Sequence, residues 1–310
     1  MTSRVRTLCI VFFLAVVAAP ASHIFAADEP FTRTQDVIYG RKFGTALTLD
    51  VIAPKANANG AAIIWVVSGG WYSNHDGINP AGVAEYLQRG YTIFAVVHGS
   101  QPKFTIPEIL EDMHRSVRFI RSQAAQYKID PERIGIYGGS AGGHLSLMQG
   151  TTGTEGKPDA KDPIDRLSSR VQAVACFFPP TDFLNYGTTG ELALGNGTLK
   201  DFKAPFDFRE YDGNLKAFVT ITDLDKRLEI GKAISPVNHV SSDDAPALII
   251  HGDADKLVPI QQAEIIIARF KEVKVPCELV VKPGAVHGWA GMEKDRLTMA
   301  DWFDKYLARK

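Results

Sequence analysis

The sequence predicts an α/β fold, in which helices cover both faces of a doubly wound, mostly parallel sheet. Unbroken apolar runs of strand length recur along the 310 residues, as expected for parallel strands that are buried on both sides. Amphipathic segments of helical length lie between these runs. The composition, 45% hydrophobic and 22% charged, is that of a globular protein with a sizeable core.

The predicted strands and helices follow in chain order. Residues 46–54, ALTLDVIAP, alternate apolar and polar side chains, which is typical of a half-exposed strand near the edge of a sheet. Later runs are mostly apolar and are predicted to be strands buried on both faces: 61–67, 91–97, 133–138, 171–178, 246–252 and 277–283. Helices are predicted where apolar residues recur at helical spacing: 107–128, 260–273 and 294–310.

Residues 182–235 interrupt this alternation. They have no clean helical or strand period, and they carry these aromatic residues: Phe183, Tyr186, Phe202, Phe206, Phe208, Tyr211 and Phe218. A long irregular segment within a compact domain is usually a lid or a binding element. We therefore expect this lid-like insertion to cover or line a substrate pocket, because a merely solvated excursion would not carry so many aromatic side chains.

The first 26 residues have the composition of a secretory signal peptide. Two arginines and no acid precede an apolar run over residues 8–19, and small residues suited to cleavage end at Ala26, with Ala21 as the alternative site. The run is shorter than the roughly 20 residues that span a bilayer, which disfavours an uncleaved membrane anchor. We expect an exported domain of residues 27–310, either periplasmic or extracellular.

The net charge limits the classes of binding partner, and the cysteines and histidines limit the disulfides and metal sites that the chain could form. The formal net charge of −1 gives no electrostatic case for nucleic acid or an anionic membrane surface, so we expect no nucleic-acid partner and no stable membrane association after signal cleavage. Cys176 and Cys277 lie in apolar strand-like runs, which favours two buried free thiols over a disulfide. The spacing of cysteines and histidines does not suggest a zinc site, and we expect no metal and no other cofactor. The sequence leaves the oligomeric state open.

The stretch RIGIYGGSAGGHLSL contains the pattern G-x-S-x-G at Gly138, Ser140 and Gly142, between a predicted strand and a predicted helix. In this context the serine occupies a tight, strained turn that exposes its hydroxyl at the carboxyl end of the sheet. The Ala141 amide would lie at the helix N-terminus, where it can stabilise an oxyanion. The glycine spacing and the missing lysine exclude a dinucleotide fingerprint and a phosphate loop. We therefore predict that Ser140 is a nucleophile.

A serine nucleophile needs a histidine base that is oriented by a carboxylate. In a strand–turn–helix site of this kind the chain order is serine, acid, histidine. Of the 8 histidines, only His287 has this order together with a position just after a strand. Asp253 and Asp255 both follow the strand at 246–252. We favour Asp255 as the acid because it lies further along the loop, whereas Asp253 could cap the turn.

The loop after the first central strand is expected to supply the second oxyanion donor. Gly69 and Gly70 allow backbone amides to approach a substrate oxygen closely, although they could also form only a tight turn. The segment HGS at 98–100 looks similar but follows the next strand, so it is not assigned to the oxyanion hole. Trp71 and Tyr72 either line the pocket or belong to the core.

Five segments carry a resemblance to a known family: LTLDVIAP, SVRFIRSQAAQYKIDPERIGIYGGSAGGHLSL, FPPTDF, ISPVNHVSSDDAPALIIHGDADKLVPIQQAE and VVKPGAVHGWAG. They resemble the secreted acetyl-esterase branch of the α/β-hydrolase fold, which contains bifunctional feruloyl and acetyl-xylan esterases and related hormone-sensitive-lipase-like enzymes. The resemblance implies this fold, with Ser140 as nucleophile, Asp255 as acid and His287 as base. It also implies oxyanion amides from these residues: Gly69, Gly70 and Ala141.

The chain departs from that family in the oxyanion loop. The family usually has His-Gly-Gly-Gly-Trp where this chain has VSGGW, so Val67 and Ser68 stand at the positions of the histidine and the first glycine. The donor glycines remain, but the anchoring of the loop differs. The insertion at 182–235 also matches no part of the family pattern.

The leading hypothesis is an exported serine esterase that acts on small carboxylic esters, such as acetyl or aryl esters, either as small molecules or linked to a polysaccharide. A second hypothesis is a serine peptidase of prolyl-oligopeptidase type. Such enzymes generally carry a β-propeller before the hydrolase domain, and the stretch between the predicted signal and the first predicted strand is too short for one, which disfavours this hypothesis. The third is a hydrolase-like binding protein without catalysis, which the intact order of serine, aspartate and histidine disfavours.

Overall fold

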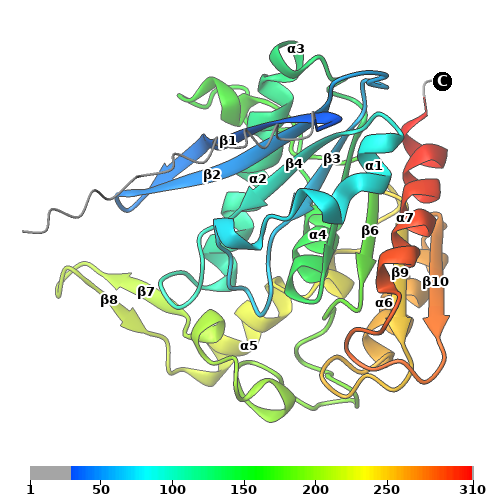
Figure 1. The fold of residues 1–310 in the computed structure, drawn as a ribbon. Helices are drawn as coiled ribbons and strands as arrows, with labels where there is room; N and C mark the ends of the chain where they lie inside the picture. Colours follow the sequence, from blue (N-terminus) through cyan, green and yellow to red (C-terminus); the bar gives the residue numbers. More distant parts are fainter. Residues whose placement is uncertain (1–28, 309–310) are drawn as a thin grey trace, which may run out of the picture.

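The computed structural model describes residues 29–308 and contains the doubly wound sheet that the sequence predicts (Figure 1). Its main sheet has 8 strands in the order β1-β2-β4-β3-β5-β6-β9-β10. β1 and β2 are antiparallel to their neighbours, and every later pair is parallel. The strands span β1 Phe31–Lys42, β2 Thr45–Pro54, β3 Ala62–Val66, β4 Thr92–Val97, β5 Ile134–Gly139, β6 Ala173–Phe177, β9 Ala247–Gly252 and β10 Cys277–Lys282.

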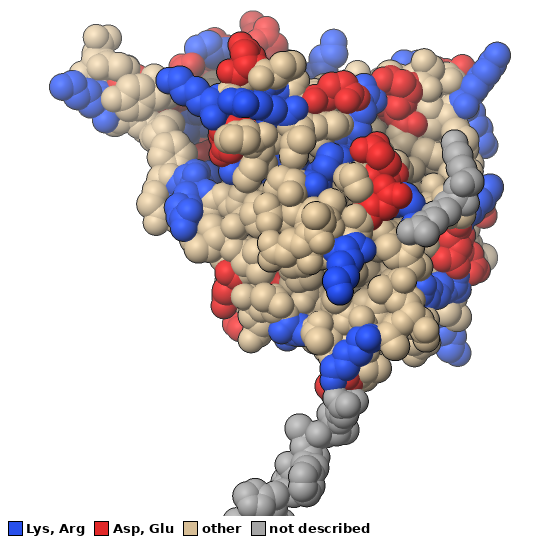
Figure 2. Space-filling view, turned by 90° about the horizontal axis from the view of Figure 1, so that it is seen from above, with Lys and Arg blue, Asp and Glu red and all other residues tan. Residues whose placement is uncertain are grey.

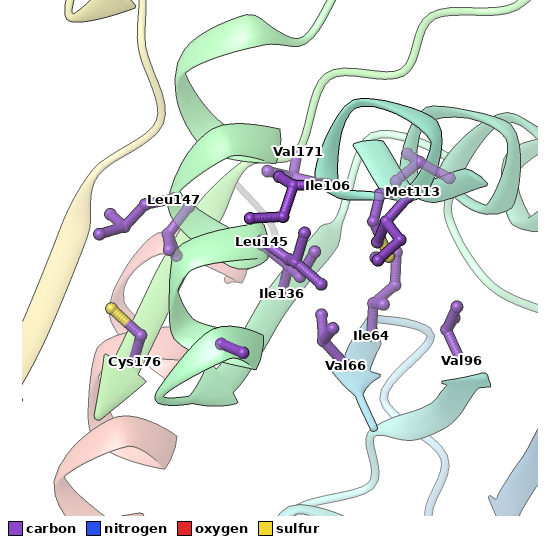
Figure 3. Packing of buried hydrophobic residues seen from close by; sticks show 14 of the residues in the cluster. Ile64, Val66, Val96, Ile106, Met113, Ile136, Leu145, Leu147, Val171 and Cys176 are labelled. Atoms are coloured by element: carbon purple, nitrogen blue, oxygen red, sulfur yellow. The ribbon is translucent and has the colours of Figure 1, made fainter. Parts of the chain in front are cut away.

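Helices cover both faces of this sheet. α2, α4 and α6 pack on one face and α1 and α7 on the other, so that each face has its own apolar core. The helices span α1 Ala84–Gln88, α2 Ile106–Ser122, α3 Ala124–Tyr127, α4 Ala141–Thr152, α5 Leu224–Ala233, α6 Gln261–Glu272 and α7 Met292–Leu307. Figure 3 shows part of the larger core, where Met113 of α2 and Leu145 of α4 pack with Ile64 and Ile136 of the central strands.

The parallel strands place their carboxyl ends along one edge of the sheet, the lower edge in Figure 1. The loops that follow β3, β5, β9 and β10 all leave the sheet at this edge. These loops carry the nucleophile, acid, base and oxyanion residues predicted from the sequence. The topology therefore brings together four segments that are far apart in the chain, as open α/β sheets generally do at their sites.

Some elements differ from those predicted. Residues 31–42 form β1, an antiparallel edge strand that the sequence pattern does not indicate because polar and charged residues occur on both of its faces. The helix predicted over 107–128 is interrupted at Gln123, where α2 ends and the short α3 follows. Cys176 and Cys277 are free thiols, as expected, but Cys277 is only partly buried. It lies on β10, which was predicted to be buried on both faces but is an edge strand with partly exposed side chains.

The insertion, residues 182–235, is more ordered than its sequence indicates. It contains an antiparallel hairpin of β7 (Arg209–Asp212) and β8 (Ala217–Thr220), followed by α5, and it lies below the carboxyl edge of the sheet in Figure 1. Several of its aromatic side chains belong to the larger core: Phe183, Tyr186, Phe206 and Phe208. Tyr211 and Phe218, on the hairpin, are exposed. Most of the insertion's aromatic residues therefore serve packing.

The predicted signal peptide, residues 1–26, lies outside the described residues. Within residues 29–308, no helix is both long enough and apolar enough to cross a membrane. The same residues contain no cluster of side chains that could hold a metal ion. On the face opposite the carboxyl edge, acidic and basic side chains are intermixed around an uncharged centre (Figure 2).

Candidate active site

Ser140 occupies the turn between β5 and α4, with φ 53° and ψ −121°. Residues other than glycine rarely adopt a positive φ, so the backbone is strained at this serine. The turn is also tightly packed, because a Cβ on Gly138 would lie 2.5 Å from the carbonyl carbon of Gly142, and a Cβ on Gly142 would lie 2.9 Å from the carbonyl oxygen of Val66. A side chain at either glycine of G-x-S-x-G would therefore clash with neighbouring backbone atoms. The tight turn presents the serine hydroxyl at the carboxyl edge.

His287 and Asp255 form a hydrogen-bonded chain with Ser140. The Ser140 Oγ lies 3.0 Å from His287 Nε2, and His287 Nδ1 lies 2.7 Å from Asp255 Oδ2. Because the carboxylate accepts the Nδ1 proton, Nε2 is left to accept the hydrogen bond of the serine hydroxyl. The ring of His287 also packs against Phe178, with 4.3 Å between the ring centroids. The structure thus brings the three residues together in the geometry of nucleophile, base and orienting acid.

Asp255 is held by backbone amides as well as by the imidazole. Its Oδ1 accepts hydrogen bonds from the amides of Leu257 and Val258, at 2.9 and 3.0 Å. Burial alone would raise the pKa of this carboxyl, but contacts with His251, His287 and the Val258 amide outweigh burial and hold the pKa well below the usual range of an aspartate. The carboxylate is therefore charged at neutral pH and can orient the imidazole.

Asp253, the alternative acid, has a different partner. Its Oδ1 accepts a hydrogen bond from the Gly284 amide at 2.6 Å. It thereby braces the turn that leads to His287, which is the capping role considered from the sequence. The structure places Asp255, and not Asp253, against the imidazole.

The loop over residues 67–73, called the oxyanion loop below, offers one free glycine amide rather than two. Gly69 and Tyr72 exchange backbone hydrogen bonds of 3.0 and 2.9 Å, so the Gly69 amide is already paired. In the described part of the chain, nothing accepts a hydrogen bond from the amides of Gly70 and Ala141. The amides left for an oxyanion are therefore those of Gly70 and Ala141, and the expectation for Gly69 is corrected.

The two aromatic residues of the oxyanion loop have different surroundings. Trp71 is 2% exposed and belongs to the core, where its Nε1 donates a hydrogen bond to His144 Nδ1 at 3.1 Å. It adopts a positive φ of 61°, which this fixed indole helps to maintain. Tyr72 is half exposed and lines a cavity at Ser140. Trp71 is thus a core residue, and Tyr72 is a pocket residue.

The cavity at Ser140 has a volume of about 460 Å³ and is open to solvent. Its walls come from the end of β3, the oxyanion loop and the nucleophile turn: Trp65, Val66, Val67, Ser68, Gly69, Tyr72, Asn74, Gly77, Gly139, Ser140 and Phe178. All of these residues lie outside the insertion, which therefore does not line this cavity; the expectation that it serves as a lid stays a prediction. The insertion instead supports the oxyanion loop, because the ring of Phe202 packs against Gly70. A Cβ on Gly70 would lie only 2.6 Å from a carbon atom of that ring.

Two buried histidines that were not assigned from the sequence support the site. His98 Nε2 lies 2.8 Å from Ser68 Oγ, and His144 Nε2 donates to the Ile234 carbonyl oxygen at 2.7 Å while its Nδ1 accepts from Trp71. Burial lowers the pKa of each histidine to about 4, so both rings are neutral at neutral pH. Two features of the sequence could have indicated these roles. His98 directly follows the predicted strand at 91–97, and His144 lies four residues after Ser140.

Known proteins resemble this chain over most of its length. The BD-FAE family model matches residues 49–270. The probable carboxylic ester hydrolase LipM of Mycobacterium tuberculosis is 27% identical over 259 residues, which are 82% of this chain and 56% of LipM. An acetylxylan esterase of Xylanibacter ruminicola is 33% identical over 104 residues, which are 31% of this chain and 20% of that protein. This chain thus spans about half the length of LipM and a smaller part of the second relative.

A solved structure extends the similarity to the whole fold. A truncated form of a carbohydrate esterase from gut microbiota superposes on this chain with a TM-score of 0.73 at 26% identity, covering 91% of this chain and 99% of that one. The family match includes the nucleophile turn and Asp255 and ends before His287. With a fold and a sequence match that agree over most of its length, this chain belongs to the BD-FAE family and has the α/β-hydrolase fold.

Proposed function

We propose that this chain is an exported serine esterase that hydrolyses small carboxylic esters through Ser140, His287 and Asp255. The observation that carries the proposal is the hydrogen-bonded chain from Asp255 Oδ2 through the imidazole to Ser140 Oγ, at a strained turn. A serine that only began a helix would need neither the strain nor an oriented base. This arrangement favours an enzyme over a non-catalytic binding protein.

The proposed reaction is acyl transfer to serine and then to water. Ser140 Oγ attacks the ester carbonyl carbon while its proton passes to His287 Nε2. The developing oxyanion accepts hydrogen bonds from the amides of Gly70 and Ala141, and one such donor is worth about 3–4 kcal/mol. The imidazolium then protonates the leaving alcohol as the C–O bond breaks. Water gives a proton to the same nitrogen as it attacks the acyl-enzyme. The imidazolium then returns this proton to Ser140 Oγ as the bond between that oxygen and the acyl carbon breaks, which releases the carboxylic acid.

The cavity supports small acetyl or aryl esters, including esters linked to a glycan, as the substrate class. Its volume of about 460 Å³ is modest, and the half-exposed Tyr72 at its wall offers an aromatic face to an aryl or sugar ring. One relative is named an acetylxylan esterase, and the similar solved structure is a carbohydrate esterase. Export, proposed from the composition of residues 1–26, would deliver the enzyme to polysaccharides outside the cytoplasm.

Hydrolysis of p-nitrophenyl acetate by the chain without its signal tests this function, with a series of acyl chains up to octanoate. We expect turnover of the short chains and a loss of at least about 10³-fold in kcat for Ser140→Ala. Ser146→Ala is the matched control, because Ser146 lies on the same helix and its hydroxyl donates only to the Gly142 carbonyl oxygen, at 2.8 Å. Equal turnover by wild type and Ser140→Ala would exclude the proposed mechanism.

A further inference from the structure

The oxyanion loop is braced by the segment that follows β4, residues 98–101. The Gln101 amide donates to the Trp71 carbonyl oxygen at 3.2 Å, and the Ser73 amide donates to Ser100 Oγ at 2.9 Å. Both hydrogen bonds hold the arm of the loop that follows the free glycine amide. Two points therefore fix the position of this arm relative to β4.

In the arm that precedes the free amide, Val67 is held by its amide, which donates to the Val96 carbonyl oxygen, and by the Ser73 hydroxyl, whereas Ser68 is held by the side chain of His98. Its Nδ1 lies 2.8 Å from the carbonyl oxygen of Gly99, which can only accept, so Nδ1 carries the ring proton. Nε2 is then an acceptor, and the Ser68 hydroxyl donates to it at 2.8 Å. Because His98 is only 2% exposed, water does not compete effectively for this bond.

Ser68 is also in contact with the nucleophile turn. Its carbonyl oxygen lies 3.4 Å from the position of a Cβ on Gly142, and the residue lines the cavity beside Ser140. The Gly70 amide follows two residues later. A displacement of Ser68 would therefore move this amide relative to the Ala141 amide, and an oxyanion hole works only when its donors are fixed within about 0.5 Å.

We propose that His98 is a positioning residue that fixes the Gly70 amide by holding Ser68. Val67, which precedes Ser68 and stands where the family usually has a histidine, has no polar side-chain atom with which to anchor the loop. His98 touches neither substrate nor reacting atoms and acts through the Ser68 hydroxyl. The inference rests on the proposed esterase function, because the position of this amide affects turnover only if an oxyanion forms there.

The variants separate the two nitrogens of the ring. His98→Asn keeps a donor toward the Gly99 carbonyl but has no group at the Nε2 position, whereas His98→Gln can place an amide oxygen there. Ser68→Ala removes the hydroxyl that donates. His114→Asn is the matched control, because His114 is another histidine whose pKa burial lowers to about 4, but it lies on α2 and contacts Ser169.

Steady-state kinetics on p-nitrophenyl acetate test the proposal. We expect His98→Asn and Ser68→Ala each to lower kcat by about 10- to 100-fold while KM changes by less than about threefold. The double variant should be no slower than the slower single variant, because both changes remove the same hydrogen bond. His98→Gln should recover most of kcat, and His114→Asn should match wild type. Wild-type kcat in His98→Asn, or losses that multiply in the double variant, would overturn the proposal.

Amide hydrogen exchange distinguishes this inference from the esterase assignment. Mass spectrometry of peptides that cover residues 67–73 should show exchange at least about tenfold faster in His98→Asn than in wild type or His114→Asn. Equal exchange in all three proteins would show that His98 does not hold the loop. A wild-type protein that neither cleaves esters nor reacts with a fluorophosphonate would refute the esterase function instead, and the exchange comparison would still decide whether His98 fixes the loop.

Discussion

The substitution Asp255→Asn should reverse the direction of the hydrogen bond to the imidazole of His287, the proposed base. The amides of Leu257 and Val258 donate to Oδ1, so the variant must keep its amide oxygen there, since an NH₂ group would face two donors. The NH₂ group then takes the Oδ2 position, 2.7 Å from His287 Nδ1. Because NH₂ donates, Nδ1 has to accept, and the ring proton moves to Nε2.

An imidazole protonated at Nε2 cannot take the proton of Ser140. The change from carboxylate to amide at such an acid costs about 10⁴-fold in kcat, which corresponds to about 5 kcal/mol of transition-state stabilisation. The fold should lose much less, because both backbone amides keep an acceptor at Oδ1. We therefore expect a large loss of turnover with a shift of only a few degrees in Tm, on the order of 1 kcal/mol of stability.

The assay is kcat and KM on p-nitrophenyl acetate, with Tm measured on the same samples. Asp253→Asn is the matched control, since the Asp253 carboxylate accepts from the Gly284 amide at 2.6 Å and an asparagine oxygen can do the same. We expect this control to stay within about threefold of wild-type kcat. If Asp255→Asn kept more than about a tenth of wild-type kcat, or if both variants lost equally, the argument from the two amides would be refuted.

Two further predictions concern stability. Gly142→Ala would place a Cβ 2.9 Å from the Val66 carbonyl oxygen, so we expect urea denaturation to show a free energy of unfolding that is lower by about 1–3 kcal/mol. The control Gly213→Ala, which has open space at its Cβ, should show little change. Equal stabilities of the two variants would contradict the packing argument. Burial lowers to about 4 the pKa of three histidines: His98, His114 and His144. An unfolded histidine titrates near 6.5, so the unfolded chain binds more protons between these values, and stability should fall as the pH drops from about 6.5 to about 4. Denaturation at pH 7.5 and pH 4.5, chosen to lie roughly outside and inside this range, checks this, and equal stability at the two values would contradict it.

Local patterns in the sequence account for the central sheet and the nucleophile turn. A parallel strand buried on both faces must be apolar throughout, so β3, β4, β5, β6 and β9 are visible as continuous runs. A turn as tight as the one at Ser140 must have Gly138 and Gly142 beside it, so the motif specifies the geometry. β1 obeys no such constraint, because an antiparallel edge strand can carry polar residues on both faces.

Contacts between distant segments could not be predicted in the same way. Trp71 and His144 are 73 residues apart, and only the packed fold shows that the indole donates to the imidazole. The pairing of the Gly69 amide with Tyr72 depends on positive φ at both Gly70 and Trp71. A tryptophan gives no hint of such a conformation, because side chains other than glycine disfavour it. The sequence therefore indicated two free amide donors, those of Gly69 and Gly70, whereas the folded backbone leaves only the Gly70 amide free in this pair.

The relay from Ile234 through His144 to Trp71 connects the insertion mechanically to the oxyanion loop. Ile234 directly follows α5, so a small shift of that helix is transmitted through the imidazole to the indole, and from there to the neighbouring donor amide. Sequence change in the insertion is then constrained even at positions that never meet substrate. A shorter insertion that ended before Ile234 would leave the His144 imidazole, and through it the Trp71 indole, without this support.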